Sequence, residues 1–84
     1  GLINRAVEAD EFDDVCAEFV DDIVEGPPVA LDYAKKVMNR GEDASLEAAL
    51  TMESQSFGLL LSTEDVLEGT SAFAEDRDPE FEGK

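Results

Sequence analysis

The chain has 84 residues, of which 22 are Asp or Glu and six are Lys or Arg, giving a formal net charge of −16. This length allows one small domain, and the negative charge argues against nucleic acid and anionic membrane surfaces as partners. With one Cys, no His and only short apolar runs, the sequence also argues against an internal disulfide, a Cys–His zinc site and a membrane span, so we expect a cytoplasmic protein.

Residues 1–8 predict a short extended segment. They begin without Met and without a signal-peptide pattern, so we interpret Gly1 as an excision point within a longer chain. The run LINRAV at residues 2–7 is short, apolar and partly β-branched, which suits a strand. Because one strand cannot form a sheet alone, we expect residues 1–8 to be a strand left from a core that precedes them.

The strongest periodic pattern comes next and predicts an amphipathic helix. Asp10 is its predicted N-cap and Gly26 its predicted C-cap, and the following Pro27 and Pro28 stop this helix and open the next one. Apolar residues recur at three- and four-residue steps and therefore share one stripe of the helix: Phe12, Val15, Cys16, Phe19, Val20, Ile23 and Val24.

Three further helices are predicted. The second starts at Val29 and ends at residues 39–41, and the third is capped by Ser45. The fourth begins at STED, with Ser62 as its cap. The fold class is thus all-α, with an extended segment over residues 1–8, a helical domain over 9–76 and a charged tail over 77–84. That tail should be irregular unless Phe81 docks, and the 43% hydrophobic content predicts a packed core.

The acidic residues are concentrated in residues 10–25, which hold eight acids and no base. Like charges at four-residue spacing destabilise a helix, and molar salt removes most of that penalty by shortening the Debye length to about 3 Å. The four-residue series consists of Asp10, Asp14, Glu18 and Asp22. We therefore predict a halophilic protein from a high-salt cytoplasm; the alternative is an ordinary solvated acidic face.

Few residues suggest chemistry of their own. Glu53 is the one acid on an apolar stripe, and is either a substrate-facing carboxylate or an acid satisfied at a helix interface. Cys16 lies within the first stripe, where packing in a core is the simpler interpretation than a reactive thiol. The sequence DASL at residues 43–46 is superficially similar to the prosthetic-group site of acyl carrier proteins, but Ala44 separates the Asp from the Ser.

Taken in order, four segments resemble the C-terminal third of the enoyl-CoA hydratase/isomerase family, the crotonase superfamily. They are GLINRAVE, EGPPVALDYAKKVMNRG, SLEAALTMESQSFGLLLSTED and EGTSAFAEDRDPEF, and from the first to the last they span nearly the whole chain. The specific features are the run PPVALDYAKKVMNRG and the ordered STED, EG, AF, R and PEF elements from Ser62 to Phe81.

This resemblance implies that an N-terminal core of ββα units, with the catalytic groups, would precede these residues. In the family that core binds acyl-CoA, and the C-terminal helices assemble trimers, often stacked as hexamers. The parent would be an enoyl-CoA hydratase (a lyase) or an isomerase of fatty acid metabolism, and this segment would be inactive alone. The coenzyme A thioester would be its substrate, without a covalently bound cofactor, and its partners would be its own core and sister subunits of a homo-oligomer.

The resemblance also implies two candidate binding residues and no catalytic or metal-binding residue. Phe57 is similar in position to a family aromatic that lines the CoA site of a neighbouring subunit, although packing against its own helices is an alternative. Where hydratases often have a Lys for the CoA phosphates, this chain has Asp76, which leaves Arg77 as the nearest cation.

The rival hypothesis is a stand-alone acidic helical interaction module that uses its apolar faces to bind a partner helix. It is supported only by the periodicity and the charge.

Overall fold

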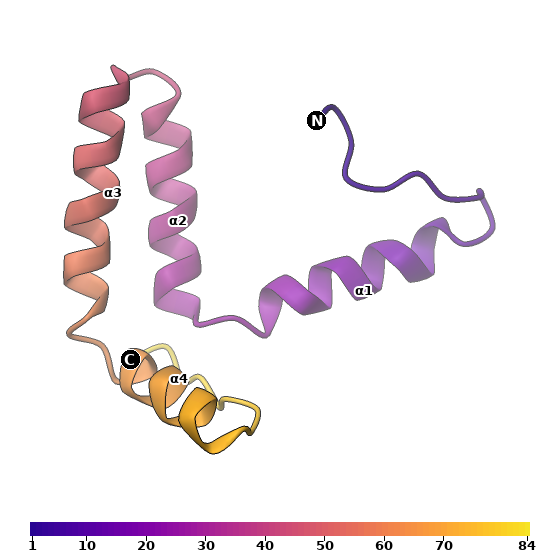
Figure 1. The fold of residues 1–84 in the computed structure, drawn as a ribbon. Coiled ribbons are helices and arrows are strands. Elements are labelled where there is room, and N and C mark those ends of the chain that lie inside the picture. Colours follow the sequence, from indigo (N-terminus) through magenta and orange to yellow (C-terminus); the bar gives the residue numbers. More distant parts are fainter.

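The computed structural model describes residues 1–84 and contains four α-helices and no strand. The helices are α1 (Phe12–Val24), α2 (Pro28–Gly41), α3 (Leu46–Leu60) and α4 (Glu64–Glu75), as Figure 1 shows. The all-α class and the number of helices are therefore confirmed. The strand predicted for residues 1–8 is not formed, because no second strand is present to share ladder hydrogen bonds with it.

The predicted helix caps are partly correct. At α3 the Ser45 hydroxyl accepts a hydrogen bond from the Ala48 N–H at 3.2 Å, as expected. At α4 the predicted cap was wrong by one residue, since the Thr63 hydroxyl caps the Val66 N–H at 3.3 Å. The Ser62 hydroxyl instead donates to the Leu59 carbonyl at 2.7 Å, and the same carbonyl, near the end of α3, also accepts the Ser62 N–H at 3.1 Å.

Both predicted caps of α1 were wrong. Glu11 occupies the N-cap position without a side-chain hydrogen bond, and Glu25 occupies the C-cap position in the right-handed region. Gly26 follows in the turn, where its N–H donates to the Ile23 carbonyl at 3.0 Å. The start of α1 is thus held by main-chain bonds alone, and its two ends carry acids.

The helices form an open arrangement. α2 and α3 run antiparallel side by side, α1 extends away from them, and α4 lies below the end of α3 beside the C-terminus (Figure 1). The radius of gyration is 15.9 Å, compared with about 12 Å for a compact domain of this length. Only Asp65 and Ala72 are buried. The predicted packed core is therefore absent, because the apolar stripes of α1 and α4 meet no facing helix.

Candidate functional site: an apolar groove below the helical hairpin

A groove of about 660 Å³ lies where the start of α2, the end of α3 and α4 come together. Its lining is mostly apolar, with Thr63, Asp65 and Thr70 as the residues that add polar or charged groups. The apolar side chains include Val29, Ala30, Phe57, Leu60, Leu61, Val66, Phe73 and Phe81. A largely apolar concavity with a few polar groups is typical of sites that take a flat or aliphatic ligand group.

Phe57, predicted from the sequence as a binding residue, lies in this groove. Its side chain comes from the last turn of α3 and remains 64% exposed. Phe73 of α4 is 90% exposed and Phe81 from the C-terminal tail is half-buried, so three phenyl rings from different segments line one groove. Their exposure leaves apolar surface for another molecule to cover.

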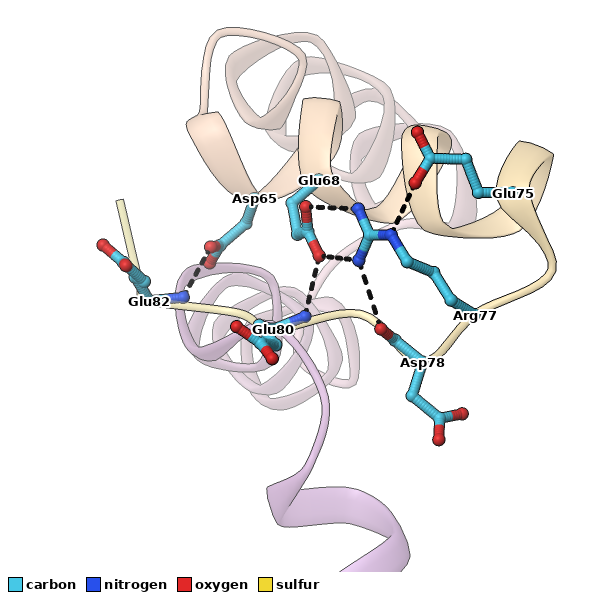
Figure 2. Close-up of polar contacts among 7 residues, drawn as sticks. All are labelled: Asp65, Glu68, Glu75, Arg77, Asp78, Glu80 and Glu82. Carbon is cyan, nitrogen blue, oxygen red and sulfur yellow. Dashed lines mark hydrogen bonds and ion pairs between the residues drawn. The ribbon is translucent and has the colours of Figure 1, made fainter.

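Arg77, the other predicted binding residue, lies outside the groove and is held by carboxylates. Its Nη1 and Nη2 donate to the two oxygens of Glu68 at 2.6 and 3.0 Å, and its Nε donates to Glu75 at 2.7 Å (Figure 2). This bidentate arrangement raises the pKa of Arg77 above its usual range. The guanidinium reaches Glu68 because Asp76 adopts a left-handed conformation, with φ of 53°, that turns the chain back along α4.

Glu68 is the centre of this polar cluster. Besides the Arg77 guanidinium, it accepts the Glu80 N–H at 2.9 Å (Figure 2). The hydrogen bond from Arg77, followed by that from the Glu80 backbone, lowers the pKa of Glu68 from 4.5 to about 2. The carboxylate therefore stays ionised throughout the neutral and mildly acidic range.

The tail, residues 77–84, is called the C-terminal strap from here on. It is irregular, as predicted, but it docks on α4 through Asp65. The Asp65 carboxylate accepts the Glu82 and Gly83 N–H groups at 2.9 and 3.0 Å, and the Asp65 N–H donates to the Lys84 carbonyl at 3.1 Å. In the sequence, Asp65 indicates only the STED start of α4, so this role was missed.

The other sequence candidates are not brought into the groove. Glu53 is exposed on α3, and Cys16 is exposed on α1, so the expected burial of that thiol was wrong. Cys16 lines a second apolar hollow of about 330 Å³ between the N-terminal segment and α1. No group of three His, Cys, Asp or Glu side chains is placed to hold a metal ion. None of the four helices combines the length and the apolar character that crossing a bilayer requires.

Comparisons with known proteins agree on one family. A family model for enoyl-CoA hydratase/isomerase matches residues 1–84. The short-chain-enoyl-CoA hydratase of Clostridium acetobutylicum is 39% identical over 77 residues, which cover 92% of this chain and 30% of that protein. The 2,3-dehydroadipyl-CoA hydratase of Escherichia coli is 33% identical over 84 residues, covering 100% of this chain and 33% of that protein.

A solved structure has the same arrangement of helices. Enoyl-CoA hydratase from Bacillus anthracis matches with a TM-score of 0.88 and 31% sequence identity, over 93% of this chain and 30% of that chain. The 84 residues therefore span about a third of the length of the relatives that they match.

Proposed function

This chain belongs to the enoyl-CoA hydratase/isomerase family, and we propose that the full-length protein containing it hydrates 2-enoyl-CoA thioesters in the cytoplasm. The support is the family match over all 84 residues, together with relatives that are named as CoA-thioester hydratases. The CoA thioester is the substrate in this proposal, and no covalently bound cofactor is needed. These residues supply no catalytic group and are inactive alone.

Within that protein, residues 9–76 serve assembly. The exposed apolar stripe of α1 packs on the N-terminal core of its own chain, and the exposed faces of α3 and α4 pack on sister subunits of a trimer or hexamer. The exposure of large apolar side chains supports this role, since such surface is unfavourable in water at about 25 cal/mol per Å². On α1 these side chains are Phe12, Val20, Ile23 and Val24.

Phe57 forms part of the wall of an acyl-CoA pocket. Its support is its position in the 660 Å³ groove beside two further phenyl rings. Arg77 is the candidate cation for the CoA phosphates, but its guanidinium already donates to Glu68 and Glu75, so a phosphate would have to displace one of these carboxylates.

We further propose that the protein is halophilic, working in a high-salt cytoplasm. The support is the net charge of −16, with no Lys or Arg among residues 10–25 to offset eight acids. In molar salt the repulsion among these side chains is screened.

The proposed function is tested by measuring the hydration of crotonyl-CoA by the full-length protein in molar KCl. We expect turnover, and for Phe57→Ala a KM raised by roughly tenfold because apolar contact area is lost. Met38→Ala is the matched control, since Met38 has a similar exposure but lies on α2, outside the faces assigned to assembly, and does not line the groove. Absence of turnover would contradict the hydratase assignment, and binding of crotonyl-CoA without turnover would favour another reaction of the family.

A further inference from the structure

The C-terminal strap and the groove share one buried carboxylate. Asp65 is 5% exposed, and its two oxygens accept hydrogen bonds from strap N–H groups. A carboxylate taken out of water without partners is strongly unfavourable, and no donors outside the strap bond to this side chain. Burial of Asp65 and docking of the strap therefore depend on each other.

A second attachment lies one turn further along α4. Glu68 is three residues after Asp65 and shares its helix face, where it binds the Glu80 N–H and the Arg77 guanidinium (Figure 2). Ala72, the other buried residue of the chain, lies on the same face. The strap thus covers one stripe of α4. Both ends of the strap are attached to this stripe, one through Glu68 and the other through Asp65.

Phe81 is held between these attachments. The flanking Glu80 and Glu82 both donate their N–H groups to α4 carboxylates, which directs the ring between them against Gly69. A Cβ at Gly69 would lie 3.3 Å from the Phe81 Cε1, so glycine permits this close approach. Phe81 is also a lining residue of the groove.

The far end of the strap reaches the start of α2. Gly83 has a φ of +74°, and a Cβ at this position would lie 3.5 Å from the Cβ of Pro28. The strap therefore runs from α4, through Phe81, to the first turn of α2, and residues of both helices line the groove.

We propose that the strap sets the width of the groove by tying α4 to α2, with Asp65 and Glu68 as positioning residues and Phe81 as the wall that they hold in place. The part of this proposal that concerns docking of the strap does not depend on any ligand. The part that concerns acyl-CoA binding rests on the proposed function. Release of the strap exposes Phe81 and opens one end of the groove.

The test is amide hydrogen exchange on the full-length protein with Asp65→Asn. An Asn side chain keeps one acceptor oxygen but turns an NH₂ group toward the second strap N–H, so one bond is lost. We expect exchange at residues 82 and 83 to rise by roughly tenfold, with α2 and α3 unchanged. Asp43→Asn removes the same charge from the α2–α3 turn and should leave these rates unchanged. Unchanged exchange in Asp65→Asn would overturn the proposal.

Two further measurements separate this proposal from a loss of folding and from the hydratase assignment. Glu68→Gln leaves the buried Asp65 intact and should raise amide hydrogen exchange at residue 80. This variant therefore tests docking of the strap if Asp65→Asn does not fold. In the hydration assay Asp65→Asn should raise KM by roughly threefold with kcat nearly unchanged; faster exchange with an unchanged KM would refute the effect on the groove. If the wild-type protein shows no hydration, the hydratase assignment fails, while the exchange rates still decide the docking.

Discussion

Glu68 shows how one side chain links the charge of this protein to its local structure. It lies beside the Arg77 guanidinium and the Glu80 N–H, with Glu75 on the other side of Arg77. Because its pKa is lowered from 4.5 to about 2, the ionised form favours the docked strap. This contribution is complete above pH 4.5 and is lost as the pH falls toward 2.

We therefore predict that the Glu80 N–H stays bonded to Glu68 at pH 7 and pH 5, and that this part of the strap is released between about pH 4.5 and 2. The amide chemical shift of Glu80 in the full-length protein, followed by NMR, measures this release. Glu68→Gln should remove the part of the transition at residue 80 that comes from Glu68, because the amide does not titrate. A Glu80 shift that moves between pH 7 and 5 in the wild-type protein would be incompatible with this mechanism.

At the same scale, some site residues could be predicted from the sequence and others could not. Ser45 was identified as a cap because an N-cap is a local feature. Phe57 was singled out because its position relative to STED resembles a family pattern; the structure places it in the groove, and its binding role stays a prediction. Asp65 and Glu68 stand three apart on one face, which indicates a polar stripe. What covers that stripe is a segment nine to eighteen residues further along the chain, and helical periodicity carries no information about such contacts.

At the scale of elements, the end of α4 depends on an Asp in an unusual conformation. Asp76 has a φ of 53°, a region that glycine adopts without strain and β-branched residues strongly disfavour. We predict that Asp76→Gly raises the free energy of unfolding by about 0.5–1 kcal/mol and that Asp76→Val lowers it by about 1–2 kcal/mol. Urea unfolding of the full-length protein measures both changes.

Asp76→Asn is the control for the lost charge, since Asn also tolerates the left-handed region, and its stability should lie near that of the wild type. A Val variant as stable as the Gly variant would show that the left-handed turn does not form in the full-length protein.

α1 carries acids at the end where the helix dipole favours cations. Its last turns hold Asp21 and Asp22, Glu25 follows, and no base is present. We predict that Asp22→Lys stabilises the protein by about 0.5 kcal/mol in dilute buffer, by removing like-charge repulsion and complementing the dipole. Thermal unfolding of the wild type and the variant in low salt and in molar KCl measures this change. An equal gain in stability in both solvents would argue against an electrostatic cause.

At the scale of the whole molecule, large apolar side chains on all four helices remain exposed. The four helices could be predicted because each is defined by its own periodicity and by the turn residues between helices. Their open arrangement could not be predicted, because a stripe such as that of α1 specifies only that it must be covered, not by which surface. The prediction of a packed core was wrong for the same reason.

The net charge also acts at this scale. With −16 charges and few ion pairs to offset them, we predict that the melting temperature of the full-length protein rises by at least about 5 °C between dilute buffer and molar KCl. Asp22→Lys should show a smaller rise, because part of the repulsion has been removed. A melting temperature independent of salt would count against halophilic adaptation.

The central claim is that the exposed apolar faces of these helices are covered by the core of their own chain and by sister subunits. Sedimentation velocity of the full-length protein in molar KCl tests it most directly. We predict a trimer or hexamer, with no monomer at micromolar concentration. A compact monomer under these conditions would contradict the assembly role of residues 9–76.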